Sequence, residues 1–273
     1  MPEPGLVSEV RAVDWRSLKS TYGSGEVVRD IVLGLASRDE AEVRQAWQQI
    51  SETVLQHQGT VYPATAAAAP FLCRIALDET ALWRAALAVR LAFLSTGYDE
   101  PYAPAGTAQA VRDAVRPYVG ELLGLWGTGD QGLDMALVAV SVAFPVEAAV
   151  FASQLRDWFG RSEPPLRTAL GLALGFHSSA DDAVKRIIED EVSQSISWVA
   201  RSGDLIAYLP NQSGFPRGNE EPYIDTPVPE AIQVARRLQA GAEEQTTNFS
   251  PVFRFLMTLM DSGGGGPLIK YPA

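Results

Sequence analysis

The sequence predicts an all-α protein, arranged as a right-handed α-solenoid of about five to six two-helix repeats. Three observations favour this fold class. Apolar residues recur at helical spacing in one run after another, the stretch 56–76 carries signals for a helix end and a helix start, and a short local pattern recurs in later helices. Stacked helical pairs of this kind bury a continuous core and leave an extended concave surface.

The stretch QHQGTVYPATAAAAPFLCRIA contains the sharpest of these signals. We expect His57 in the last turn of one helix and Gly59 as its C-terminal cap, because glycine adopts the left-handed conformation without a Cβ penalty. Pro63 in a first helical turn, or Thr65 as an N-terminal cap, would start the next helix. Pro70 lies inside that helix and predicts a bend, since proline removes a backbone donor.

Helical periodicity also locates the other elements. A short first helix around Trp15 and Leu18 would close one end of the array. Beyond residue 177 the repeat pattern fades, although the apolar spacing stays helical. Residues 1–262 are thus expected to form one domain with inserted loops near 96–106 and 210–228, followed by a flexible glycine-rich tail at 263–273. Earlier helices are expected at about 26–36, 39–57, 64–77, 79–94, 107–126, 131–144, 146–159 and 165–176.

A four-residue pattern recurs in the second helix of each pair: an apolar residue, a charged residue, a spacer and an alanine. The copies are spaced by 40, 50 and 33 residues, within the range of two-helix repeats, and the inserted loop explains the longest interval. The small alanine allows two helices to approach closely. The copies are Val43-Arg44-Gln45-Ala46, Trp83-Arg84-Ala85-Ala86, Leu133-Asp134-Met135-Ala136 and Leu166-Arg167-Thr168-Ala169.

An apolar-Arg-x-Ala helix after an aspartate-containing turn, together with a proline-containing first helix, resembles HEAT repeats. The stretch HQGTVYPATAAAAPFL is similar to bacterial HEAT-like repeat proteins, and the resemblance covers roughly residues 15–177. It implies an α-solenoid and specifies fold far better than function. Asp134 departs from the pattern by replacing the arginine of the third copy.

Composition and charge narrow the classes of partner. The chain of 273 residues has a net charge of −11 and a pI near 4.7, so a nucleic-acid backbone is not expected as a partner. Cys73 is the single cysteine, which excludes an intrachain disulfide. No membrane span or secretory signal is expected, and the predicted location is the cytoplasm. The acidity would serve solubility or would steer a basic protein partner.

Few residues carry recognisable site chemistry. The two histidines, His57 and His177, are interpreted as helix-end residues or, alternatively, as partner contacts. No metal-binding motif is present, and no cofactor is expected. Cys73 is expected to be a buried structural thiol, and most of the tryptophans are expected to pack in the core.

The two inserted loops mix aromatic and charged residues and are the stronger candidates for binding, because loops on a rigid scaffold often carry function. Tyrosine and arginine are typical interface anchors. The candidate partner-binding residues in these loops, at the helix ends and in the repeated arginine positions are His57, Tyr62, Arg84, Tyr98, Glu100, Tyr102, Arg167, His177, Phe215, Arg217, Glu221 and Tyr223.

Two function classes follow. The first is a non-catalytic protein-interaction module, acting as a scaffold, regulator or immunity-type binder through its concave face and loops. The alternative is a small-molecule enzyme that uses carboxylate, tyrosine and arginine groups in the groove, because carboxylates suffice for acid–base work when burial shifts their pKa. HEAT-like folds include DNA glycosylases and bilin lyases, but the net charge argues against the former and the scarcity of histidine and cysteine against the latter. The first class is therefore preferred, and no catalytic residue is predicted.

Overall fold

The computed structural model describes residues 4–51, 55–57, 60–97, 99, 102–162 and 170. These residues are mostly helical, which confirms the predicted all-α class. The described residues up to Phe144 belong to one compact unit, and those from Pro145 onward belong to a second. The expected helix at 165–176 and the loop near 210–228 lie outside the described residues, and the single-domain extent stays a prediction.

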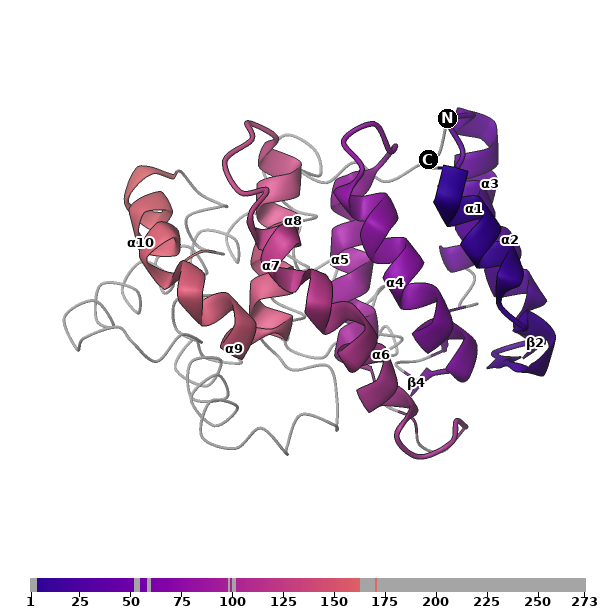
Figure 1. Ribbon diagram of the computed structural model, residues 1–273. Coiled ribbons are helices and arrows are strands. Elements are labelled where there is room, and N and C mark those ends of the chain that lie inside the picture. Colours follow the sequence, from indigo (N-terminus) through magenta and orange to yellow (C-terminus); the bar gives the residue numbers. More distant parts are fainter. Residues whose placement is uncertain are drawn as a thin grey trace, which may run out of the picture. The chain divides into compact units, whose positions relative to one another are not determined.

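The first unit contains eight α-helices, two short 3-10 helices and two short hairpins among its described residues (Figure 1). The second unit contains α9 (Pro145–Ala148), the 3-10 helix η3 (Ala149–Phe151) and α10 (Ala152–Arg161). The elements of the first unit are α1 (Pro4–Ala12), η1 (Trp15–Ser17), β1 (Lys19–Ser20), β2 (Gly23–Ser24), α2 (Glu26–Leu35), α3 (Glu40–Ser51), β3 (Gln56–His57), β4 (Thr60–Val61), α4 (Pro63–Leu77), α5 (Arg84–Ser95), α6 (Thr107–Val115), η2 (Arg116–Tyr118), α7 (Val119–Leu123) and α8 (Gln131–Ala143).

Within the first unit, helices that follow one another in sequence also pack together. α2 packs on α3, α4 on α5, and α7 on α8. Helices from different pairs also meet: α4 contacts α2 and α6, while α5 contacts α8 and lies beside it in Figure 1. The core therefore runs through neighbouring helical pairs.

The packing of α2 follows directly from its sequence. Its apolar residues Val28, Ile31, Val32 and Leu35 are buried, at the spacing of one helix face. On the same helix, a Cβ added at Gly34 would lie 2.7 Å from the Cβ of Ala46 on α3. Ala46 is the alanine of the first four-residue copy, so the expected close helix approach is confirmed at this pair.

The helix expected at 39–57 is shorter than its periodicity predicts. Strands β3 and β4 form an antiparallel hairpin in which His57 pairs with Thr60. The prediction that His57 lies in a last helical turn and that Gly59 caps it is therefore wrong. The two residues between the strands are Gln58 and Gly59, and an X-Gly pair between short strands favours a tight hairpin.

The start of α4 agrees with the sequence at Pro63 but not at Thr65, because Tyr62 is the N-terminal cap and Thr65 lies inside the first turn. Pro63 occupies the first turn, where its missing N–H costs nothing. The backbone N–H of Tyr62 donates to Thr65 Oγ1 at 3.2 Å, and the Thr65 hydroxyl donates to the Leu55 carbonyl at 2.6 Å. Pro70 lies inside the helix as predicted.

The N-terminal end differs from the single short helix that was expected. α1 is an additional helix, and Trp15 begins a 3-10 turn instead of an α-helix. The Trp15 side chain is buried, its Nε1 donates to the Val10 carbonyl at 2.6 Å, and its ring centroid lies 6.4 Å from that of Phe71 on α4. This tryptophan thus fastens the N-terminal segment to the core.

Two other helices expected as continuous are broken. Pro117 falls in η2, between α6 and α7, where it cannot donate to the preceding turn. In the second unit, η3 separates α9 from α10. The tryptophan expectation is confirmed in part: Trp47 and Trp126 are buried, whereas Trp83 and Trp158 are half-buried.

No single helix of the described residues is both long enough and apolar enough to cross a membrane. Taken together, α8 and the helices at 145–161 pass that test as a bent pair, by length and composition alone. The residues of α8 are mostly buried in the first unit.

Candidate protein-binding surface

The structure describes the side chains of three of the predicted binding residues: Tyr62, Arg84 and Tyr102. For His57 it gives the backbone, in β3. The remaining predicted residues lie outside the described part of the chain: Tyr98, Glu100, Arg167, His177, Phe215, Arg217, Glu221 and Tyr223.

Tyr62 and Arg84 support the fold. Tyr62 is buried and precedes the first turn of α4. The Arg84 guanidinium donates from Nε to the Ala76 carbonyl at 2.9 Å and from Nη2 to the Leu77 carbonyl at 3.5 Å. Because the last carbonyls of a helix have no intrahelical partner, Arg84 satisfies the C-terminal end of α4 from the start of α5.

Tyr102 is exposed over 56% of its surface, in the segment between α5 and α6. Asp99 organises this segment, since its Oδ2 accepts from the Gly106 N–H at 2.6 Å and its carbonyl accepts from the Ala103 N–H at 2.7 Å. Gly106 has φ +87, which only glycine adopts readily, and it precedes the first residue of α6. Asp99 therefore hydrogen-bonds on the C-terminal side of Tyr102, to Ala103 and Gly106.

Lys19 joins this segment to the β1–β2 hairpin. Its Nζ donates to the Tyr102 carbonyl at 3.0 Å, across 83 residues of sequence. The hairpin carries a second exposed aromatic residue, Tyr22, which is 67% exposed in the turn before β2. Tyr22 is not among the binding residues predicted from the sequence. The composition of Thr21-Tyr22-Gly23-Ser24-Gly25, with two glycines and two hydroxyl residues, was the available signal for a turn.

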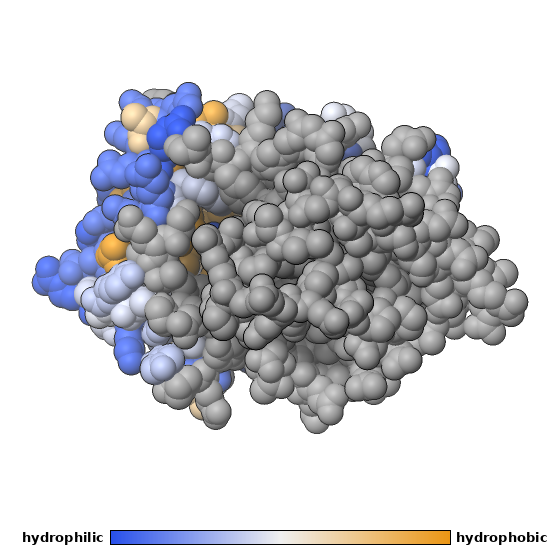
Figure 2. Space-filling view, turned by 180° about the vertical axis from the view of Figure 1, so that it is seen from behind, coloured by the Kyte–Doolittle hydropathy of each residue, from blue (hydrophilic) through white to orange (hydrophobic). Residues whose placement is uncertain are grey.

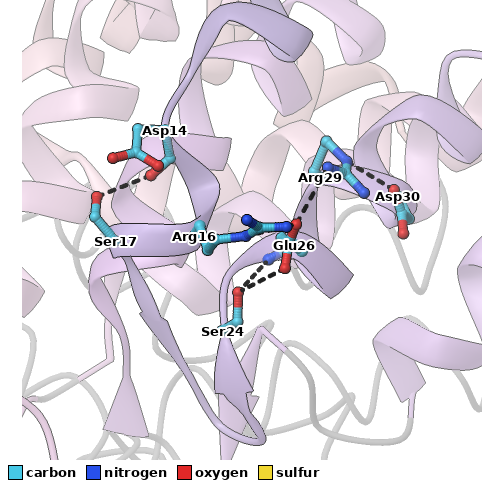
Figure 3. A network of polar contacts seen from close by, with 7 residues as sticks. All are labelled: Asp14, Arg16, Ser17, Ser24, Glu26, Arg29 and Asp30. Carbon is cyan, nitrogen blue, oxygen red and sulfur yellow. Dashed lines mark hydrogen bonds and ion pairs between the residues drawn. The ribbon is translucent and has the colours of Figure 1, made fainter.

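Charged residues adjoin this hairpin in a mixed network (Figure 3). Arg16 Nε lies 3.4 Å from Glu26 Oε1, and the Ser24 hydroxyl donates to Glu26 Oε2 at 3.4 Å. Arg29 Nε donates to Asp30 Oδ1 at 2.8 Å, and this hydrogen bond raises the pKa of the arginine. The acids and bases of the network pair with one another, so it balances charge beside the hairpin.

Two aspartates of the first unit have shifted pKa values of opposite sign. Burial raises the pKa of Asp134, against a hydrogen bond from the Gly127 N–H at 3.1 Å. Partial burial also acts to raise the pKa of Asp78, but hydrogen bonds from Thr80 and Arg38 outweigh it, and the net shift is downward. Both carboxylates lie near helix ends and accept hydrogen bonds from backbone groups or neighbouring side chains. Their role there is structural.

Other reactive groups are buried or dispersed. Burial raises the pKa of the Cys73 thiol, so this cysteine is a structural core residue, as expected. Among the described residues, no three histidine, cysteine, aspartate or glutamate side chains gather closely enough to hold a metal ion. The exposed aromatic residues are therefore the most distinctive feature of the described surface in the first unit.

The described surface visible in Figure 2 is mostly hydrophilic, with hydrophobic residues in isolated spots. In the described part of the chain, the large apolar or aromatic residues that are strongly exposed are Tyr22, Tyr102, Val146 and Val150. Comparison of the chain with protein families, with curated proteins and with solved structures finds no match.

Proposed function

We propose that the chain is a non-catalytic protein-interaction module, built as a right-handed α-solenoid of HEAT-like repeats, that holds a protein partner with its loops and concave face. Support for the repeat architecture comes from contacts between successive helical pairs. α4 contacts both α2 and α6, and α5 contacts α8, as expected when each pair packs on the next.

Two side-chain contacts link the first pair to the second at nearly the repeat spacing. Arg38 Nη2 lies 2.5 Å from Asp78 Oδ2, and these residues are 40 positions apart, the interval between the first two copies of the four-residue pattern. Arg44, the arginine of the first copy, lies over the ring of Trp83, the apolar residue of the second, at 5.7 Å from the ring centroid. Arg38 and Asp78 are thus equivalent positions in contact, and Arg44 contacts the residue next to its own equivalent, which supports a repeating unit.

The observation that carries the binding function is the exposure of Tyr102 on a segment held by Asp99 and Lys19. An aromatic anchor held in place before binding loses less conformational entropy when a partner docks. Tyrosine is also among the residues that contribute most to protein interfaces. An exposed tyrosine with a hydrogen-bonded backbone therefore suits protein recognition.

The test is affinity capture with the purified full chain. The immobilised protein is exposed to a lysate of its source organism at low and then moderate salt, in parallel with Tyr102→Ala and with Val150→Ala as a control at a more exposed apolar site. We expect one protein in stoichiometric amount on the wild type and on Val150→Ala, with clear loss on Tyr102→Ala. Retention of no protein by the wild type would contradict the proposed function.

A further inference from the structure

The two exposed tyrosines of the first unit belong to segments that are far apart in the sequence and joined in space. Tyr22 lies in the turn of the β1–β2 hairpin, and Tyr102 lies between α5 and α6. The Lys19 ammonium, in β1, donates to the carbonyl of Tyr102 itself. One hydrogen bond therefore connects the backbone that carries one ring to the hairpin that carries the other.

The β1–β2 hairpin, which carries Tyr22, is held by several backbone and side-chain contacts. The Ser20 hydroxyl donates to the Ser24 carbonyl at 2.9 Å, and the Gly25 N–H donates to the Leu18 carbonyl at 2.8 Å. A Cβ added at Gly25 would lie 2.8 Å from the Trp15 carbonyl oxygen and 3.1 Å from the Ala64 Cβ, so the hairpin closes tightly on η1 and α4. The Tyr22 ring is thus presented from a closely packed hairpin, and the Lys19 hydrogen bond attaches the Tyr102 backbone to it.

We propose that Tyr22 and Tyr102 form one docking surface for an arginine- or lysine-bearing segment of a protein partner. The proposal rests on the proposed function and names the surface and the partner chemistry. The negative face of a phenol ring attracts a guanidinium or ammonium group, with guanidinium the more frequent partner. Lys19 acts as a positioning residue, because its donor holds the Tyr102 segment against the hairpin.

The net charge of the chain favours a basic segment over an acidic one. It is −11, which attracts cations over distances of about a Debye length. Beside the hairpin, Glu26 pairs with Arg16, and the Lys19 ammonium lies on the Tyr102 carbonyl, so the preference for a cation comes from the net charge and from the aromatic faces. The first unit already pairs arginine with aromatic faces internally: the Arg112 guanidinium lies 4.7 Å from the centroid of the Phe144 ring.

The binding test uses short fluorescent peptides of alternating glycine and arginine, glycine and lysine, or glycine and glutamate, with the full chain at low and moderate salt. The variants are the double substitution Tyr22→Leu with Tyr102→Leu, which keeps apolar area but removes the aromatic faces, and the matched double substitution to Phe. We expect the dissociation constant for the arginine peptide to rise at least about fivefold in the double Leu variant. The double Phe variant should stay within about twofold of the wild type, because phenylalanine retains the aromatic face.

Lys19→Met supplies an independent readout of the positioning role. This variant should show faster amide hydrogen exchange in residues 102–107, because the hydrogen bond to the Tyr102 carbonyl is lost. Exchange rates equal to the wild type would contradict the positioning role. Unchanged melting temperatures would show that the exposed substitutions leave the fold intact.

Equal affinity of the wild type and the double Leu variant for the arginine peptide would overturn the proposal, since binding would then come from diffuse charge alone. Preference for the glutamate peptide would overturn it as well. If a lysate protein still binds the double Leu variant as strongly as the wild type, the docking surface is refuted while the proposed interaction function stands.

Discussion

Two junctions between paired helices in the first unit are held together by different physical means. At the α2–α3 junction, Gly34 and Ala46 bring the helix backbones close, and the contact depends on side-chain size. At the α4–α5 junction, Arg84 satisfies the last carbonyls of α4, and Asp78 accepts from Arg38 and Thr80. The α2–α3 junction is therefore expected to tolerate a change of side-chain charge but not of side-chain volume. The α4–α5 junction is expected to tolerate a change of volume but not of charge.

The α4–α5 junction also contains local backbone strain. Trp83 has φ 53, the only positive φ among the described non-glycine residues. The left-handed conformation costs a non-glycine residue roughly 1–2 kcal/mol. Contacts at this junction offset that cost: Arg44 lies over the Trp83 ring, and the next residue, Arg84, is anchored on α4. Polar contacts thus hold the turn at Trp83 in a backbone conformation that its local propensity disfavours.

The largest predicted effect is at the size-dependent junction. Gly34→Leu should lower the free energy of unfolding by about 2–3 kcal/mol or more, because any side chain at this position overlaps Ala46. Denaturant unfolding followed by circular dichroism measures the change. The matched control is Gly120→Ala on α7, where an added Cβ meets open space and stability should rise by about 0.5–1 kcal/mol. Equal effects at the two glycines would refute the size argument.

The next effect in size is at the polar junction. Arg84→Met keeps much of the side-chain volume but removes both hydrogen bonds to the end of α4, and we expect a loss of about 1–3 kcal/mol. Unfolding of Arg116→Met provides the comparison, because Arg116 is exposed and its pair with Asp113 is expected to contribute about 0.5 kcal/mol or less. If the two arginine variants lose equal stability, the Arg84 contacts do not hold this junction.

A smaller effect concerns the ion pair of the same junction. The lowered pKa of Asp78 means that its contribution is present above the ordinary aspartate pKa and is lost as the pH falls through the folded-state value. Asp78→Asn should therefore destabilise the protein at pH 7 by about 1 kcal/mol or less, the range for partly exposed pairs, and have little effect once the pH is below the folded-state pKa of Asp78. A loss of the same size at both pH values would show that the charge is irrelevant.

The smallest effect has the opposite sign and concerns the turn before α8. Because the pKa of Asp134 is raised, the folded state favours the protonated carboxyl, and stability is lost as the pH rises through the ordinary and then the folded-state pKa. Asp134→Asn keeps an acceptor for the Gly127 N–H and should be slightly more stable than the wild type at pH 7 but not at low pH. A thermal melt series across pH measures the difference, and destabilisation at pH 7 would contradict the prediction.

The sequence by itself predicted the elements whose signals are local. α2, α4 and α8 follow from apolar residues at helical spacing and from their flanking residues, such as Pro63 and Thr65 at the start of α4. The Gln56–Val61 region shows the limit of periodicity. The apolar spacing before it predicts that the helix continues to His57, whereas the Gln58-Gly59 pair is compatible with a hairpin. The structure has the hairpin.

The tertiary structure alone decided which surface residues come together. Composition and residue spacing were enough to predict the all-α class and to select Tyr102 as a binding residue, because both signals are local in the sequence. The pairing of Tyr102 with the hairpin of Tyr22 depends on a hydrogen bond across 83 residues, and the structural role of Arg84 depends on where the end of α4 lies. Neither contact produces a recognisable pattern in the sequence, because long-range side-chain contacts depend on how the helices pack.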